Sequence, residues 1–321
     1  MSVAQAERDE RRRRQLTDLH TRLTNAVEDL AHGDAWRRML DIAARLPTYS
    51  PNNVLLITVQ RPDAARVAGY QAWRAMGRHV RKGETGIAIL APCLYREPVT
   101  ETATNAGPPP VAGDAVERGS QVLRGFRVVH VFDITQTEGP DLPPDPQLLV
   151  GHSPADLWTR LSALVATDGF VLERGPCGTA NGYTRFDTAT IRIRDDVDDL
   201  HAVKTLAHEI GHVRADHHTR FADTYHRSAG CRGLAEVEAE SIAHIVLGAT
   251  GVDTGVYSLP YIAGWSDGDS SLLRDTADHV VRVASRILRE MEPALTEDTV
   301  TVGARELQTN QQSTVIGGLT R

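Results

Sequence analysis

The chain has 321 residues, 41% hydrophobic and 5% aromatic, as expected for a soluble globular protein with room for two domains. Its net charge of −7 argues against a protein that coats nucleic acid, although residues 1–98 carry +5 and the remainder −12. We find no signal-peptide core, no apolar run long enough for a bilayer and no CxxC pair among the three cysteines, so we expect a cytoplasmic protein without a disulfide framework.

The first part of the chain is predicted to be helical. Leucines and a valine recur at helical spacing over residues 4–31, and Asp34 can cap a second helix that continues to about Arg45. After two prolines, Asn52 can cap a short apolar helix that ends near Arg61. These patterns predict a run of helices before the first strand.

Strand signals follow. Residues 69–76 have room for one or two helical turns, and residues 78–92 are typical of a strand pair, because glycines punctuate a buried apolar run. Strand-like alternation resumes over 122–132. The intervening segment 98–120 is rich in Pro, Gly, Ala and Thr, which indicates a flexible loop.

A domain boundary is expected at 137–150, which is rich in proline and acidic residues and therefore predicts a linker. The predicted domains are 1–136 and 151–295, and the polar segment 296–321 is expected to be a disordered tail. The second domain should contain a helix from its cap Ser153 to Ala166, strands near 170–173, 183–186 and 190–194, and helices over 200–215, 234–247 and 272–291.

Residues 208–212 read His-Glu-Ile-Gly-His, an HExxH pattern within a predicted helix. Positions i and i+4 lie on one helical face, so His208 and His212 can bind the same metal ion. Glu209 is rotated toward the open side, where it can take a proton from a water molecule at the metal. The pattern predicts a catalytic zinc site with Glu209 as general base. The competing interpretation is a helix that displays two surface histidines.

A catalytic zinc site needs a third protein ligand and an open position. The next predicted helix offers Glu236, Glu238 and Glu240. Glu236 and Glu240 share a face, beside alanines that allow two helices to approach closely. We select Glu236 as the third ligand and Glu240 as the acceptor that holds a ligand imidazole, whereas Glu238 is expected in solvent. Without the upstream motif, an ordinary solvated face would be the better interpretation of all three.

The HEIGH motif followed by ExxAE resembles the ImmA/IrrE-type metallopeptidases and the C-terminal part of ArdC-like antirestriction proteins, over roughly residues 150–290. In those families two motif histidines and a downstream glutamate bind zinc, which implies His208, His212 and Glu236 here. The choice among the three glutamates rests partly on this resemblance. The residue that stabilises the oxyanion stays open among Tyr183, Tyr225, His226 and Tyr261.

In the N-terminal half, TYSPNNVLL at 48–56, GYQAW at 69–73 and GRHVRKGETG at 77–86 resemble the N-terminal domain of ArdC-like proteins, over about 15–135. In that family this domain is implicated in binding single-stranded DNA. Protein sites for single-stranded DNA usually combine aromatic rings that stack on bases with basic side chains that contact phosphates. The candidate residues are Asn53, Tyr70, Trp73, Arg74, Arg78, Arg81 and Lys82. The competing interpretation is a buried Trp73 and a solvated face of arginines.

Together these patterns predict an α+β protein of two domains, the C-terminal one zincin-like with an HExxH helix and a following glutamate helix. The expected cofactor is Zn2+, and the expected partners are single-stranded DNA and a protein or peptide substrate, with no membrane. The predicted function is that of a zinc metalloendopeptidase with an antirestriction or mobile-element role. The alternative is a DNA-binding, DNA-protecting protein whose zinc site is structural or vestigial.

A closed structural site would take a further ligand from His217, His218 or His244. Otherwise we expect His217 and His218 to form a hydrophilic helix end, where imidazoles are favourable to the helix dipole.

Overall fold

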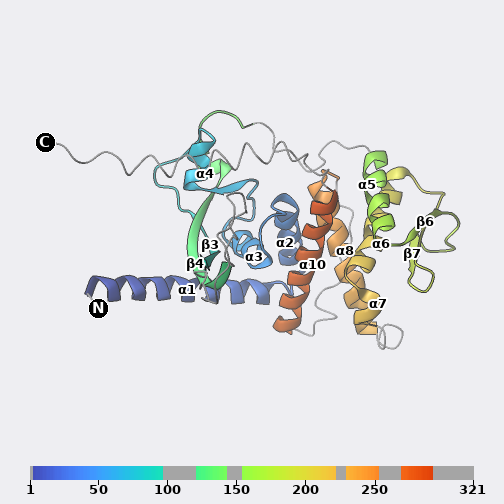
Figure 1. Ribbon diagram of the computed structural model, residues 1–321, viewed down its shortest axis with the longest axis horizontal. Helices are drawn as coiled ribbons and strands as arrows, with labels where there is room; N and C mark the ends of the chain where they lie inside the picture. Colours follow the sequence, from blue (N-terminus) through green and yellow to red (C-terminus); the bar gives the residue numbers. More distant parts are fainter. Residues whose placement is uncertain (1–2, 97–120, 143–153, 222–228, 253–268, 292–321) are drawn as a thin grey trace, which may run out of the picture. The chain divides into compact units, whose positions relative to one another are not determined.

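The computed structural model describes residues 3–96, 121–142, 154–221, 229–252 and 269–291 (Figure 1). The predicted loop at 98–120, the cap Ser153 and the predicted tail lie outside these residues. Contacts divide the chain into a first unit, residues 1–143 with 261–278, and a second unit, residues 144–260 with 279–321. Helices and strands occur in both units, in agreement with the expected α+β class.

The first unit begins with the helices α1 (Val3–Asp29), α2 (Gly33–Arg45), α3 (Pro51–Gln60) and α4 (Tyr70–Ala75). Apolar faces of the longer helices pack together, and Trp36 is fully buried. The predicted caps are wrong, because the N-cap positions of α2 and α3 are His32 and Ser50. Asp34 and Asn52 instead lie in the first helical turns, where a negative charge such as that of Asp34 favours the helix dipole.

The described strands of the first unit belong to two antiparallel sheets. One contains β1 (Val67–Gly69), β4 (Gln121–Asp133) and β3 (Ile87–Arg96) in that order, and β2 (His79–Val80) pairs with β5 (Thr137–Glu138). The predicted strand pair over 78–92 is therefore wrong, since β2 and β3 have different partners. The 3-10 turn η1 (Ile134–Gln136) leads into β5, so the start of the predicted linker is part of a sheet.

Two amide side chains of α3 complete the outer edge of β3. Asn53 donates to the carbonyl oxygen of Leu90 and accepts from its N–H, at 3.0 and 2.9 Å. Gln60, two helical turns later, makes the same pair of bonds with Ala88, at 2.9 and 3.0 Å. Unpaired backbone groups on an edge strand are costly when buried and can template aggregation. The α3 helix therefore covers this edge.

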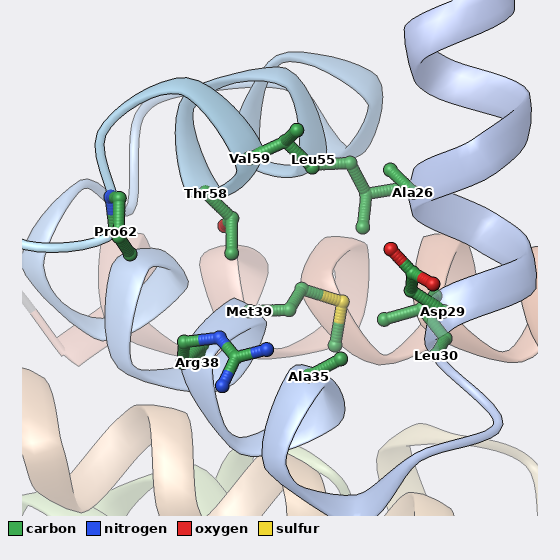
Figure 2. Close-up of a pocket in the computed structure, with 10 residues that line it drawn as sticks. All are labelled: Ala26, Asp29, Leu30, Ala35, Arg38, Met39, Leu55, Thr58, Val59 and Pro62. Atoms are coloured by element: carbon green, nitrogen blue, oxygen red, sulfur yellow. The ribbon is translucent and has the colours of Figure 1, made fainter.

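A small pocket lies among α1, α2 and α3 (Figure 2). Its volume is about 220 Å³, and its lining is mostly apolar, with Asp29 and Arg38 as the charged members. Sites for small organic ligands usually span about 300–1,000 Å³. We therefore interpret this pocket as a gap in helix packing rather than a ligand site.

The second unit contains α5 (Pro154–Thr167), β6 (Val171–Arg174), β7 (Gly182–Arg185), β8 (Thr190–Ile193), α6 (Asp199–Arg214), α7 (His217–Arg220) and α8 (Ala229–Ala249). Its sheet has the order β6-β8-β7, in which β6 and β8 are parallel and β7 is antiparallel to β8. The last helix of the described residues, α10 (Ser270–Met291), starts in the residue range of the first unit and ends in that of the second.

Close packing of α6 against α8 organises the second unit. Asp198 caps α6 by accepting a hydrogen bond from the N–H of His201 at 2.8 Å. At Gly211 a Cβ atom would lie 3.0 Å from the Cα and carbonyl oxygen of Ala239, so the two backbones meet where both residues are small. In the described part of the chain, no helix has the length and apolar character that a membrane span requires.

Candidate metal centre

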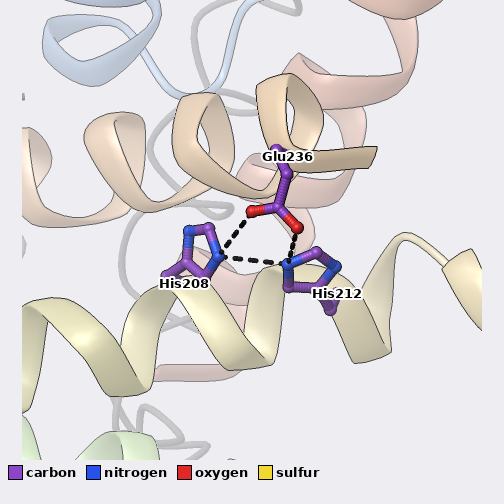
Figure 3. Close-up of side chains that lie close together, drawn as sticks. All are labelled: His208, His212 and Glu236. Carbon is purple, nitrogen blue, oxygen red and sulfur yellow. Dashed lines mark hydrogen bonds and ion pairs between the residues drawn. The ribbon is translucent and has the colours of Figure 1, made fainter. Parts of the chain in front are cut away.

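The side chains of His208, His212 and Glu236 converge at the contact between α6 and α8 (Figure 3). The two histidine Nε2 atoms are 3.1 Å apart. Glu236 places Oε2 3.3 Å from Nε2 of His208 and Oε1 3.7 Å from Nε2 of His212. Ligands at about 2.0–2.2 Å in a tetrahedral zinc site lie roughly 3.3 Å apart. The donor atoms and their spacing therefore fit a zinc-sized ion.

The three side chains differ in exposure. The His208 and His212 side chains keep 21% and 9% of their accessible surface, whereas Glu236 keeps 47%. The imidazoles are thus enclosed by protein, and the carboxylate side of the cluster is open to solvent. A catalytic metal site needs such an open position, whereas a structural site is closed.

Electrostatic coupling within the cluster is strong. Burial by itself would lower the pKa of His208, but its hydrogen bonds to Glu236 and Glu240 raise the pKa to about 10. Burial would raise the pKa of Glu236, but the nearby His208 and His212 imidazoles hold it far below its ordinary value. Without metal, these contacts therefore favour a protonated His208 imidazole beside the Glu236 carboxylate. A metal ion has to displace that proton to bind.

Each ligand imidazole has a partner on its other nitrogen. His208 Nδ1 lies 3.0 Å from Oε2 of Glu240, which is the arrangement that the predicted supporting role of Glu240 requires. His212 Nδ1 lies 2.8 Å from Nδ1 of His217. His217 Nε2 in turn lies 2.9 Å from Oε2 of Glu238. Both nitrogens of His217 are therefore engaged.

The surroundings of Glu238 and His217 differ from those predicted. Glu238 is fully buried rather than solvated, because α7 covers it and supplies His217 and Arg220 as partners. His217 keeps only 2% of its surface, so it is not part of a hydrophilic helix end. His218 does match that expectation in being exposed, and its ring stacks on Phe186 at 4.9 Å.

Glu209 lies next to the cluster without belonging to it. It is buried, and its Oε2 accepts a hydrogen bond from the hydroxyl of Thr184 at 2.7 Å. Thr184 stands on β7, and no motif in the sequence indicated it, because the contact joins residues that are distant along the chain. Of the oxyanion candidates, Tyr183 lies on the same strand with the Arg185 and Arg192 guanidinium groups 6.0 Å from its ring. The other three lie outside the described residues.

Three of the predicted DNA-binding residues have side chains that are buried in the first unit and bonded to it. Trp73 is 0% exposed, and its indole N–H donates to the carbonyl oxygen of Phe132 at 2.9 Å, so its ring is not available for stacking. Arg78 is buried and donates to the hydroxyl of Thr137 at 2.8 Å and to the carbonyl oxygen of Pro140 at 2.6 Å. Asn53 closes the outer edge of β3.

The other four predicted residues are exposed, namely Tyr70, Arg74, Arg81 and Lys82. Tyr70 keeps 47% of its surface and lies four residues before Arg74, so the two share one face of α4. Arg81 pairs with Glu84 at 2.8 Å and donates to the carbonyl oxygen of Thr135 at 2.6 Å. The structure therefore leaves Tyr70, Arg74 and Lys82 as the more accessible candidates.

The chain is similar to known proteins. An uncharacterized protein of Bacillus anthracis is 25% identical over 320 residues, and the match covers 86% of this chain and 51% of that protein. The chain thus spans about half the length of this curated relative.

Crystal structures of the antirestriction protein ArdC from the R388 plasmid, metal-free and Mn(II)-bound, are 18% and 17% identical to this chain. The matched residues make up 76% and 77% of this chain and 85% and 86% of the ArdC chains. The TM-score is 0.45 in both cases. Residues 14–132 match the family model for the N-terminal domain of the anti-restriction factor ArdC.

Proposed function

We propose that this chain is a zinc-dependent metallopeptidase whose active site lies on α6 and α8. The observation that carries the proposal is the convergence of two imidazole nitrogens and one carboxylate at zinc-ligand spacing, with a non-ligand glutamate on the same helix. Nitrogen and oxygen donors of this kind suit zinc in a three-ligand catalytic site. The 47% exposure of the Glu236 side chain leaves one side of the cluster accessible to water.

The roles of the protein side chains follow from their contacts. His208, His212 and Glu236 would hold the ion, and a bound zinc ion would supply a Lewis acid that polarises a peptide carbonyl and activates water. Glu209 takes the proton of the attacking water on its carboxylate and returns it to the departing amine nitrogen. Thr184 holds Oε2 of Glu209, which leaves Oε1 to accept that proton.

A structural zinc site is the competing function of the same residues. It would need a closed set of four protein ligands. His217 does not supply the fourth, because His212 and Glu238 occupy its two nitrogens. A structural site also needs no general base, whereas buried Glu209 lies next to the cluster. Both observations favour catalysis.

The test is digestion of a peptide library by the purified full chain, read by mass spectrometry. We expect cleavage by the zinc-loaded protein, loss of cleavage with a chelator and recovery when zinc is restored. Glu209→Gln should retain zinc, because Glu209 is not a ligand, and lose about 100- to 10,000-fold in rate. Cleavage at the parent rate by the Gln variant would eliminate Glu209 as the base. Stoichiometric zinc without any cleavage of peptides or proteins would favour the structural alternative.

We also infer that the first unit binds single-stranded DNA, in an antirestriction role connected with mobile elements in the cytoplasm. The support is the match of residues 14–132 to the ArdC N-terminal domain, together with exposed Tyr70 and Arg74 on one face of α4. An exposed ring beside basic side chains can stack on bases of any sequence while contacting phosphates.

Fluorescence anisotropy with labelled oligonucleotides tests this second function on the full chain. We expect single strands to bind more tightly than duplex, with affinity that falls as salt rises. Replacing Arg74, Arg81 and Lys82 together by alanine should reduce affinity and flatten the salt dependence, by roughly 0.7 logarithmic units of slope for each phosphate that is no longer neutralised. An unchanged slope would mean that these residues form only a solvated face.

A further inference from the structure

A chain of buried side chains leads away from the metal cluster on the Nδ1 side of His212. His212 contacts His217 at 2.8 Å, and His217 contacts Glu238 at 2.9 Å. The side chains of His217 and Glu238 keep 2% and 0% of their surface. Arg220 donates to both carboxylate oxygens of Glu238, at 2.6 and 3.0 Å. Neither His217 nor Glu238 belongs to the predicted ligand set.

The order of these contacts favours one placement of the ring protons. A carboxylate only accepts hydrogen bonds, so His217 carries a proton on Nε2 and donates it to Glu238. Arg220 already compensates the charge of Glu238, so His217 has no need of a second proton. Its Nδ1 is then an acceptor, and the short contact requires that His212 donate from Nδ1–H. The lone pair of His212 is thereby left on Nε2, which faces His208 and Glu236.

The backbone is shaped to make this contact. Asp216 adopts the left-handed conformation, with φ of 55°, between the end of α6 and the start of α7. This conformation is uncommon for residues other than glycine, and aspartate is among those that tolerate it best. The sharp turn brings His217 back beneath His212, five residues earlier in the chain.

We propose that His217 and Glu238 are positioning residues that hold His212 in the tautomer and orientation needed to bind the metal through Nε2. The proposal rests on the metal site put forward above and deepens it. The two ligand histidines are then supported differently. His208 donates to the carboxylate of Glu240, whereas His212 donates to a neutral imidazole whose own proton is fixed by Glu238. Partners of ligand imidazoles typically change metal affinity about 10- to 100-fold when removed.

The test compares zinc affinity among variants of the full chain by competition with a chromophoric chelator. His217→Phe keeps an aromatic ring in the buried position and leaves Glu238 paired with Arg220, so no unpaired charge is created. We expect its zinc affinity to fall about 10- to 100-fold. His218→Phe is the matched control, because His218 is exposed and stacks on Phe186 without contacting a ligand. Its affinity should equal that of the parent.

A conservative variant separates positioning from packing. In His217→Asn the amide oxygen stands near the place of Nδ1 and can accept from His212, so part of the affinity should return. A role in packing alone would predict the opposite order, with Phe tolerated better than Asn. Equal zinc affinity of the parent and His217→Phe would overturn the proposal.

Nitrogen-15 NMR of the histidine rings gives a readout that does not depend on any variant being stable. The parent should show one ring with a protonated Nε2 and an unprotonated Nδ1 that correlates with His217, and the opposite tautomer would overturn the proposal. Failure of the proposed function looks different. Zinc binding that depends on His217, without peptide cleavage, refutes the peptidase and leaves the positioning role. Absence of zinc binding by the parent refutes both.

Discussion

The two units use their buried polar side chains in different ways. In the first unit these side chains mostly satisfy backbone groups: Asn53 bonds to Leu90, Arg78 to the carbonyl oxygen of Pro140, and Asp133 to the N–H groups of Ala65 and Arg66. In the second unit, the buried polar side chains next to the metal cluster bond to other side chains, as His212 does to His217 and His217 to Glu238.

This difference separates side chains that stabilise the fold from side chains that determine what the imidazoles can bind. A side chain that satisfies the backbone holds two segments of chain in register, and its loss leaves a buried donor or acceptor unpaired. A side chain that bonds to an imidazole chooses the tautomer and direction of that ring, and its loss alters what the ring can bind. We therefore expect substitutions in the first set to lower stability, and substitutions in the second to change metal binding first.

The largest expected effect is on the metal. His212→Ala should reduce bound zinc from about one ion per chain to a small fraction, because two ligands do not hold the ion in place. Elemental analysis after dialysis measures this directly. Glu209→Gln, one turn away on the same helix, is the control that should keep its zinc. Equal zinc in parent and His212→Ala would mean that the ion lies elsewhere. The buried polar side chains of the second unit would then not serve metal binding.

A large effect on stability is expected at Asp133 in the first unit. This residue is 1% exposed, and its carboxylate accepts hydrogen bonds from the N–H groups of Ala65, Arg66 and Thr135, at 2.8, 3.1 and 2.9 Å. Asp133→Asn should cost about 2–3 kcal/mol in the free energy of unfolding, because an amide group cannot accept at both positions. Exposed Asp141 provides the control, and Asp141→Asn should change the free energy by less than about 0.5 kcal/mol.

The same carboxylate predicts a pH dependence. Burial would raise the pKa of Asp133, but the hydrogen bonds from Thr135, Ala65 and Arg66 outweigh it and lower the pKa. A lowered folded-state pKa contributes stability that is present above the unfolded value, about 3.9, and is lost as the pH falls through the folded value. The difference in unfolding free energy between parent and Asp133→Asn should therefore be constant near neutral pH and shrink below about pH 4. A difference that grows on acidification would contradict this sign.

An intermediate effect is expected at Gly211. Gly211→Ala places a methyl group 3.0 Å from backbone atoms of Ala239, so α6 and α8 must separate slightly. Overpacking costs about 1–3 kcal/mol, and the better helix propensity of alanine returns up to about 1 kcal/mol, which leaves a net loss of about 1–2 kcal/mol. Zinc affinity should fall as well, since Glu236 stands on the displaced helix. Gly33→Ala in α2 has open space and should not destabilise the chain.

The smallest effect on stability is expected at Tyr70. Because this side chain is 47% exposed, Tyr70→Ala should change the unfolding free energy by less than about 0.5 kcal/mol. Its affinity for single-stranded DNA should nevertheless fall, by about 1–3 kcal/mol if one base stacks on the ring. Chemical denaturation and anisotropy on the same preparation separate the two. A destabilised variant would place Tyr70 with the side chains that hold the fold.

Much of the second unit could be predicted from the sequence. The i, i+4 spacing of His208 and His212 and of Glu236 and Glu240 specifies a helix face whatever the rest of the chain does, so the convergence of ligand atoms could be anticipated from two short segments. The helices of the first unit follow from the same periodicity, although the N-caps of α2 and α3 fall two residues earlier than expected.

Only the tertiary structure decided which polar side chains are buried, and with which partners. In the sequence, Trp73 and Arg78 look like a nucleic-acid contact. In the structure both side chains are buried and donate hydrogen bonds to carbonyl groups of β4 and β5. Glu238 looks solvated in the sequence because the residues around it on α8 do not indicate that α7 packs there. In the structure α7 brings His217 and Arg220 to it. Helical periodicity is set by hydrogen bonds four residues apart, so the sequence displays it, whereas burial and tautomer depend on segments that meet only when the chain has folded.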